Sequence, residues 1–318
     1  MSEQRTSKQL LPVGFYDLLF DEAEKNHENI NVALAAFRAG GYRLIKTPLV
    51  EFEDSFAQQD TLKNTFRATD VISGKNIVFR NDITPQISRL MATRLKKENF
   101  PVKLCYSGDV LCAKSDNLYA DRQQTQVGIE IICDQTNKEG EKYDIEAINS
   151  LLVALQNLKV KDALIEFSLP DFLDVFLAEL GIQNSDALRS AIMQKDLSEI
   201  RNLVGSHSKI IGRIVLSNND LVGLSQEISA QITSTKISAE LKKAEIISDY
   251  LKENFPEVEL RFDLFGDHSS TYHSGISFDV FSGGFSYPIA SGGRYNINEL
   301  KAVGATIYIN RLLKSIAV

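Results

Sequence analysis

Two neighbouring stretches, Tyr106-Ser-Gly-Asp-Val-Leu-Cys-Ala-Lys114 and Arg122-Gln-Gln-Thr-Gln-Val-Gly-Ile-Glu130, decide the fold of this chain. Apolar and β-branched residues recur in and around both, so we expect strands over Val102–Leu111 and Gln126–Cys133. Between the strands lies a polar segment, Ser115–Asp121, which we expect to be a loop. The sequence therefore predicts an antiparallel pair of strands.

Upstream of this pair, the chain predicts a long helix followed by a strand. Apolar positions recur at helical spacing from Leu18 to Ala39, and Gly40-Gly41 ends the pattern. Tyr42–Phe52 is rich in strand-forming residues but contains Pro48, which favours a strand end or a sheet edge at that point.

A short strand and two helices are predicted around the central pair. Ile77–Arg80 has the composition of a short strand. Thr84-Pro85 predicts a helix start, with the threonine hydroxyl as N-cap and proline in the first turn, and we expect this helix to continue through Leu95. Tyr143–Leu158 predicts a helix that packs back on the sheet.

The spacing of apolar residues changes near Pro170. Over residues 171–234 they recur at helical spacing, and strand patterns are almost absent. Beyond this predicted helical insertion, we expect a helix over Ile237–Asn254. Strands should follow over Val258–Phe265, Gly275–Phe281, Tyr287–Ala290 and Gly304–Ile309. Strands that come early and late, with helices between them, favour an α+β fold. We expect a mostly antiparallel sheet flanked by helices, with residues 1–170 and 235–318 as one core domain.

Composition narrows the class of protein. The chain has 318 residues, of which 43% are hydrophobic and 24% charged, as in globular proteins. It has no apolar run of about 18 residues, and its polar start, MSEQRTSKQL, has no signal-peptide core, so we expect no membrane partner and a cytoplasmic location. A net charge of -7 argues against nucleic-acid binding. Three cysteines without CxxC spacing predict free thiols and argue against a disulfide framework or a zinc site. We expect no metal and no cofactor.

The central strand pair resembles motif 2 of class II aminoacyl-tRNA synthetases of the histidyl type. There, a Gly-Pro-x-Phe-Arg-x-Glu strand turns through a loop into Arg-Gln-Phe-x-Gln-x-Gly-x-Glu, and the Arg, Glu and Phe hold ATP. This chain has Cys112, Lys114 and Gln124 at those places. The upstream helix and strand resemble motif 1, which builds the dimer interface in that family. The resemblance implies a class II catalytic-domain fold without its ATP-binding side chains.

Two other family positions have also changed. The catalytic Arg of the family falls on His268, which is mostly uncharged at neutral pH and cannot replace a fixed bidentate cation. Motif 3, usually Gly-x-Glu-Arg-Leu, is Tyr308-Ile-Asn-Arg311-Leu312 here, which places a ring where the family has a glycine. We expect these changes to abolish amino-acid activation. The chain ends six residues after Leu312, so we also expect no anticodon-binding domain.

The amino-acid side of the same site resembles the family more closely. Arg80-Asn-Asp-Ile-Thr84 resembles Leu-Arg-Pro-Glu-Gly-Thr, Tyr272-His-Ser-Gly275 resembles Tyr-Tyr-Thr-Gly, and Ser291-Gly-Gly-Arg-Tyr295 resembles Gly-Gly-Gly-Arg-Tyr-Asp. The resemblance implies a histidine-like pocket lined by Asp82, Thr84, Gln126, Glu130, Tyr272 and Tyr295. Carboxylates accept hydrogen bonds from an ammonium group or an imidazole N–H, so this set suits a basic amino acid. Without the resemblance, alternating polar residues on a strand would simply face solvent.

A metal site or a nucleophilic triad in the loop near His268 is disfavoured. Asp267, His268 and His273 lack a recognised ligand spacing, and a serine-rich loop explains them better. No Gly-x-Ser-x-Gly nucleophile elbow supports a Ser-His-Asp triad.

Taken together, a histidine-like pocket without ATP groups resembles the regulatory subunits of ATP phosphoribosyltransferase, over nearly the whole chain. The resemblance implies a non-catalytic subunit that joins a short catalytic subunit in a hetero-octamer. That assembly converts ATP and phosphoribosyl pyrophosphate into phosphoribosyl-ATP, the first step of histidine biosynthesis, under feedback inhibition by histidine. Two alternatives stay open: an enzyme that activates an amino acid for a non-tRNA acceptor, and a sensor of histidine or uncharged tRNA.

Overall fold

The computed structural model describes residues 10–55, 62, 64–114, 121–134, 141–169, 172–216, 220–266 and 273–316. Its centre is a sheet with the strand order β1-β5-β6-β11-β10-β9-β7-β8. The strands are β1 (Arg43–Ile45), β5 (Val102–Leu111), β6 (Gln123–Cys133), β7 (Leu164–Ser168), β8 (Glu259–Phe262), β9 (His273–Phe281), β10 (Ala290–Ile297) and β11 (Leu300–Tyr308). All neighbours are antiparallel except the outermost pairs, β1 with β5 and β7 with β8. The predicted α+β fold with a mostly antiparallel sheet is confirmed.

The β5–β6 pair confirms the antiparallel prediction at the centre of this sheet. Tyr106 lies opposite Gly128, and Leu104 lies opposite Glu130. From Gln126 onward, every residue of β6 is buried. Buried residues on both faces of a strand mean that layers cover the sheet on both sides at this point.

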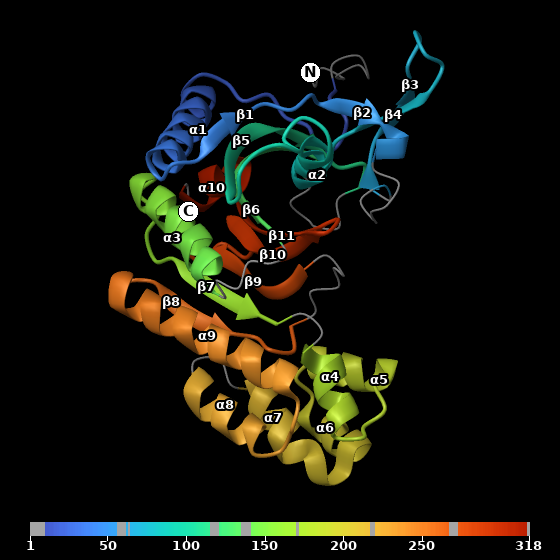
Figure 1. Ribbon diagram of the computed structural model, residues 1–318, viewed down its shortest axis with the longest axis vertical. Coiled ribbons are helices and arrows are strands. Elements are labelled where there is room, and N and C mark those ends of the chain that lie inside the picture. Colours follow the sequence, from blue (N-terminus) through green and yellow to red (C-terminus); the bar gives the residue numbers. More distant parts are fainter. Residues whose placement is uncertain are drawn as a thin grey trace, which may run out of the picture.

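Three helices cover one face of the strands around β6. They are α1 (Asp21–Ala39), α3 (Lys142–Asn157) and α10 (Ile309–Ile316), and α1 and α3 lie side by side (Figure 1). Phe37 of α1 and Leu151 of α3 are fully buried in the same core as Ile129 and Ile131 of β6. Each such burial contributes about 1.5–3 kcal/mol, so this face fixes the position of the central strands.

A smaller sheet lies beside the first. It contains β2 (Val50–Phe52), β3 (Arg67–Thr69) and β4 (Asn76–Phe79) in the order β2-β4-β3, and η2 (Glu53–Ser55) and α2 (Thr84–Ala92) flank it (Figure 1). The break predicted at Pro48 is confirmed, because β1 ends before this residue and β2 begins after it. The two halves of the predicted strand therefore belong to different sheets.

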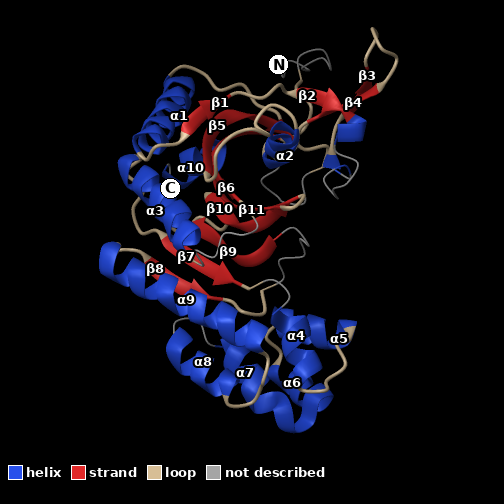
Figure 2. Cartoon of the chain, in the orientation of Figure 1, coloured by secondary structure: helices blue, strands red, loops and turns tan. Residues whose placement is uncertain are grey.

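Short helices follow β7 and form a group at one end of the molecule (Figure 2). They are α4 (Phe172–Glu179), α5 (Asp186–Met193), α6 (Leu197–Val204), η4 (Gly205–His207), α7 (Ser208–Leu216) and α8 (Leu221–Ser229), and α9 (Thr235–Asn254) lies between them and the sheet. The N-cap side chains of α5, α6 and α8 are Ser185, Asp196 and Asp220. The division into a core domain and an insertion at residues 171–234 stays a prediction.

Several predicted boundaries were wrong. α2 ends at Ala92 and does not reach Leu95. Thr84 is the first residue of α2 and makes no capping bond, because its hydroxyl donates to Glu130, 46 residues away in sequence. The strand expected over Tyr287–Ala290 starts only at Ala290, so the Gly-Gly-Arg-Tyr segment lies on β10 itself. In the part of the chain that the structure describes, no helix combines the length and apolarity that a membrane span requires.

Candidate ligand site

A cavity of 370 Å³ lies at the centre of the large sheet, between β6, β10 and β11 and the segment that precedes α2. Its described walls include Asn81, Asp82, Thr84, Val110, Cys112, Gln124, Gln126, Glu130, His273, Ser291, Tyr295, Gly304, Tyr308 and Arg311. Residues of both predicted halves, the amino-acid side and the former ATP side, thus share one cavity.

Glu130 forms the most buried acidic group of this cavity, with only 1% of its surface exposed. Its Oε1 accepts hydrogen bonds from the hydroxyls of Thr84 at 3.1 Å and Tyr106 at 3.4 Å. Its Oε2 accepts one from the Tyr295 hydroxyl at 2.6 Å. Three elements, α2, β5 and β10, therefore hold the carboxyl group in one orientation.

Burial raises the pKa of Glu130 to about 8. The nearby charge of Asp82 also raises this pKa, whereas the hydrogen bond from Tyr295 lowers it. Burial therefore favours the neutral acid form of Glu130 at neutral pH. The carboxyl group lies directly over β11, where a Cβ at Gly304 would come within 2.1 Å of its Oε2. Glycine at that position is thus a condition for the observed position of Glu130.

Asp82 and Gln126 form a second polar pair on the wall beside α2. Asp82 Oδ1 accepts a hydrogen bond from the Ile83 amide at 2.8 Å, and Gln126 Oε1 accepts a longer one from the same amide at 3.3 Å. Burial raises the pKa of Asp82, although hydrogen bonds from Ile83, Gln126 and Thr84 oppose that rise. Two acidic groups therefore face one small cavity, which favours a ligand that carries donors or positive charge.

The former ATP side of the cavity has a different surface. Cys112, Gln124, Tyr308 and Arg311 lie there. The guanidinium carbon of Arg311 stands 4.3 Å from the centre of the Tyr308 ring, and its Nη1 donates to the Pro288 carbonyl at 3.1 Å. This cation is therefore stacked on an aromatic ring and also hydrogen-bonded within the protein.

The structure brings together five of the six predicted pocket residues, and Tyr272 lies outside the described residues. Of the predicted former ATP positions, Cys112, Gln124 and Tyr308 line the cavity, whereas His268 lies outside the described residues. Lys114 instead exchanges backbone hydrogen bonds with the side chain of Asn64, away from the cavity. That the pocket residues bind a ligand stays a prediction.

Sequence reasoning missed Tyr106, which holds Glu130 from the β5 side and also shares a 3.0 Å hydrogen bond with Thr306. It fits because Gly128 lies directly opposite, where a Cβ would come within 2.5 Å of the Tyr106 hydroxyl. A tyrosine and a glycine in register on paired strands are a signal that the sequence contains. Using it requires the register, which local patterns do not supply.

Arg294, from the Gly-Gly-Arg-Tyr segment, has a structural role. Its side chain points to α3, where its Nε donates to Asp144 Oδ1 at 3.1 Å and the pair is almost buried. The pair ties β10 to α3 and leaves the next residue, Tyr295, to reach Glu130. Among the described residues, no cluster of three or more His, Cys, Asp or Glu could hold a metal ion.

The sheet and pocket define a catalytic domain of the histidyl-tRNA synthetase type. A family profile described as histidyl-tRNA synthetase matches residues 14–312. Two solved structures have a similar fold. An ATP phosphoribosyltransferase regulatory subunit/histidyl-tRNA synthetase from Bacillus halodurans matches with a TM-score of 0.83 and 20% identity, over 99% of this chain and 84% of that one. A chain of the ATP phosphoribosyl transferase (HisG:HisZ) complex from Thermotoga maritima matches with a TM-score of 0.67 and 18% identity, over 91% of this chain and 97% of that one.

Curated relatives narrow the class further. The ATP phosphoribosyltransferase regulatory subunit of Ectopseudomonas mendocina is 31% identical over 90% of this chain and 74% of its own length. That of Paramagnetospirillum magneticum is 28% identical over 98% of this chain and 83% of its own length. The chain belongs to the family of ATP phosphoribosyltransferase regulatory subunits within this synthetase-like class. The predicted family, and the prediction of a regulatory subunit in place of an enzyme, are confirmed.

Proposed function

We propose that this chain binds histidine in the 370 Å³ cavity and, joined to a short catalytic subunit of ATP phosphoribosyltransferase, makes the formation of phosphoribosyl-ATP sensitive to histidine. The observation that carries this proposal is the position of Glu130, an almost fully buried acid that three hydroxyl groups orient toward a small cavity. Such a group selects a ligand that can donate a hydrogen bond or neutralise a charge.

Histidine suits this cavity for chemical reasons. Its ammonium group and its imidazole N–H are donors, and the cavity offers the acidic groups of Glu130 and Asp82 as acceptors. A ligand without such donors would displace water from these polar groups and give no hydrogen bond in return, which costs about 1–3 kcal/mol for each. The cavity therefore discriminates against apolar amino acids of similar size.

The assembly that we propose has two parts. The first is a homodimer through the region of α1, β1 and β2, where Leu44 and Leu49 are 51% and 39% exposed beside the exposed side chain of Leu18. Large apolar side chains gathered on one face are typical of an interface. The second is a hetero-octamer with the catalytic subunit in the cytoplasm. The family of the chain and the solved HisG:HisZ complex from Thermotoga maritima support this assembly.

An enzyme that activates an amino acid for a non-tRNA acceptor is the rival hypothesis. Such an enzyme has to bind ATP, but Cys112, Gln124 and Tyr308 occupy the side where a nucleotide would lie. None of these three is a cation that could pair with phosphate, and Arg311, a cation on the same wall, stacks on Tyr308. Histidine-dependent exchange of pyrophosphate into ATP by the pure chain would support this rival.

Reconstitution with a short catalytic subunit tests the proposal. We expect phosphoribosyl-ATP formation to increase when this chain is added, and histidine to inhibit the mixture. Glu130→Gln should keep the activation and lose much of the inhibition, whereas Glu259→Gln, on the distant edge strand β8, should behave like the unmodified chain. No activation would overturn the proposed role. Full inhibition of the Glu130→Gln mixture would overturn the pocket as the site of histidine.

A further inference from the structure

A second and larger cavity lies back to back with the histidine pocket. It measures 690 Å³, and its walls include Thr47, Pro48, Arg80, Gly108, Thr125 and Asn310. Three of these residues have direct neighbours in sequence that line the first cavity: Asn81 follows Arg80, Gln126 follows Thr125, and Arg311 follows Asn310. Thr125 and Gln126 lie on strand β6, where successive side chains point to opposite faces of the sheet. There the two cavities lie on the two faces of one strand.

Arg80 is the charged group of this shared wall, and it is 4% exposed. Its Nη1 donates to the hydroxyl of Thr47 at 2.8 Å and to the carbonyl of the same residue at 3.1 Å. Its Nε donates to the Asp109 carbonyl at 2.7 Å. The main chain is held as well, since the Arg80 amide donates to Leu49 O at 3.0 Å and its carbonyl accepts from Leu111 N at 2.8 Å. One residue thus ties β5 to the segment between β1 and β2.

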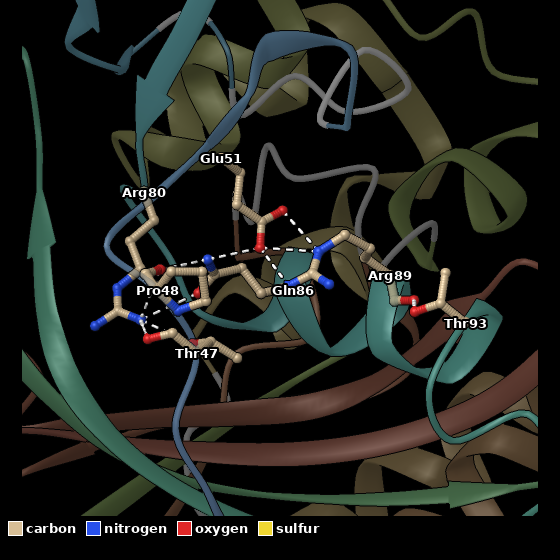
Figure 3. A network of polar contacts seen from close by, with 7 residues as sticks. All are labelled: Thr47, Pro48, Glu51, Arg80, Gln86, Arg89 and Thr93. Atoms are coloured by element: carbon tan, nitrogen blue, oxygen red, sulfur yellow. Dashed lines mark hydrogen bonds and ion pairs between the residues drawn. The ribbon is translucent and has the colours of Figure 1, made fainter. Parts of the chain in front are cut away.

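Gln86 of α2 orients this guanidinium and is itself fully buried. Its Oε1 accepts from Arg80 Nη1 at 3.1 Å, while its Nε2 donates to Pro48 O at 2.7 Å and to Glu51 Oε1 at 2.9 Å (Figure 3). Arg89 closes the network with a two-pronged contact to Glu51. Because the amide uses both of its ends, the network has a single satisfied arrangement.

Space for the guanidinium exists only because residue 108 is glycine. A Cβ there would lie 2.0 Å from Arg80 Nη2. The planar guanidinium is therefore fitted between Gly108 and Thr47 and cannot shift alone, since a shift would leave buried donors without acceptors. Movement of the Arg80 main chain must move the Thr47-Pro48 segment with it.

We propose that Arg80, oriented by Gln86, is a positioning residue that transmits occupancy of the histidine pocket to the Thr47-Pro48 segment on the second cavity. The proposal rests on the proposed histidine pocket. A ligand that binds Asp82 and Thr84 would restrain the segment that follows Arg80. Arg80 in turn holds Thr47 and Pro48 through hydrogen bonds to their carbonyls. The second cavity, whose walls also include Leu18, Leu44 and Leu49 of the proposed homodimer interface, is thus the surface on which a second copy of this chain would sense the ligand.

Hydrogen–deuterium exchange of the full chain, with and without saturating histidine, tests this coupling. We expect histidine to slow exchange in peptides from both cavities, residues 123–134 for the pocket and residues 43–52 for the second cavity. The slowing at residues 43–52 should be about threefold, within the range that such networks transmit. Thr47→Val removes one acceptor of Arg80, and Gln86→Met removes the orienting amide. In both variants the response at residues 43–52 should be lost and that at residues 123–134 kept.

Thr93→Val is the matched control, because Thr93 belongs to the same network but touches only the Arg89 carbonyl at its far end (Figure 3). It should respond like the unmodified chain. A purely structural role would accelerate exchange at residues 43–52 equally with and without histidine, and that result would overturn the proposal. So would an unchanged response in both Thr47→Val and Gln86→Met, or no response at residues 43–52 in the unmodified chain. If residues 123–134 also fail to respond there, the histidine pocket itself is refuted.

Discussion

The two walls of the central cavity differ in how their side chains are held. On the amino-acid side, Glu130 accepts hydrogen bonds from Thr84, Tyr106 and Tyr295, so its position depends on three separate elements. On the former ATP side, Arg311 stacks on Tyr308, and the neighbouring described residues Cys112 and Gln124 are uncharged.

The difference shows that the two halves of one site can be maintained separately. Glu130 is held by long-range contacts that also stabilise the fold, so its loss would cost stability as well as binding. Cys112 lies on the other wall, where its main chain exchanges hydrogen bonds with Arg122, a neighbour at the end of the same strand pair. We therefore expect substitutions on the two walls to have unequal effects, and the following predictions test that inequality.

The largest effect is expected for Glu130→Gln. The substitution keeps the shape of the side chain but leaves no carboxylate to pair with a cationic ligand. A lost charge-assisted hydrogen bond costs about 1.5–3 kcal/mol. Histidine affinity, measured by calorimetry, should fall about ten- to a hundredfold. Glu259→Gln should leave it unchanged. Equal affinity of Glu130→Gln and the unmodified chain would remove Glu130 from the site.

A smaller effect is expected for Gly304→Ala. The added methyl group would meet Glu130 Oε2 at 2.1 Å and force the carboxyl group toward the cavity. Overpacking of this kind costs about 1–3 kcal/mol of unfolding free energy, and histidine affinity should fall about tenfold, which corresponds to 1.4 kcal/mol.

The matched control for this change is Gly212→Ala, in helix α7. There a Cβ would meet only Leu197 Cδ2 at 3.5 Å, an ordinary contact. Alanine in a helix interior stabilises by about 0.5–1 kcal/mol relative to glycine. Urea unfolding of both variants measures the contrast, and equal stability of the two would contradict the close packing of Glu130 on β11.

The pKa of Glu130 predicts a moderate dependence on pH. The unfolded chain loses this proton near 4.5 and the folded chain near 8. Between these values the unfolded state binds fewer protons, so the free energy of unfolding should fall as pH rises through this window and level off above it. The fall should be shallower in Glu130→Gln, as measured by urea unfolding at pH 5, 6.5 and 8.

Histidine binding should follow the same titration. A cationic ligand favours the charged form of Glu130, so binding near pH 7 should release a proton, and affinity should rise with pH by at most about tenfold per unit. Calorimetry in two buffers of different ionisation enthalpy measures the proton count. Proton uptake on binding would show that the ligand does not contact Glu130 through a cation.

The smallest effects are expected on the other wall. Cys112→Ser and Lys114→Ala should change histidine affinity by less than about twofold, within the usual ±0.5 kcal/mol of substitutions outside a network. Lys114 does not line the cavity, so Lys114→Ala should change histidine affinity less than Cys112→Ser does. A loss near that of Glu130→Gln would mean that the two walls act as one unit.

Much of the fold was predictable because it rests on local patterns. The strand Val102–Leu111 and helix α3 follow from periodicity, and the break at Pro48 follows from its missing amide. The N-cap at Thr84 failed because Glu130, distant in sequence, takes the hydroxyl that a local rule assigns to the helix. Local rules do not include a competitor that only the tertiary structure brings near.

The candidate site was predictable in part, through the resemblance of its motifs. Asp82, Gln126 and Glu130 were assigned to one pocket, and they line one cavity. Tyr106 was missed, because its role depends on the register that sets it opposite Gly128. The network around Arg80 was missed for the same reason, since Gln86 and Gly108 have no common sequence signature.

Parallel calorimetric titration of the full chain with histidine and with magnesium ATP tests the central claim most directly. One wall of the cavity is organised around Glu130, whereas on the other wall the cation of Arg311 stacks on Tyr308 and donates to the Pro288 carbonyl. We expect saturable heat with histidine and none with ATP. Binding of ATP together with silence toward histidine would contradict this claim.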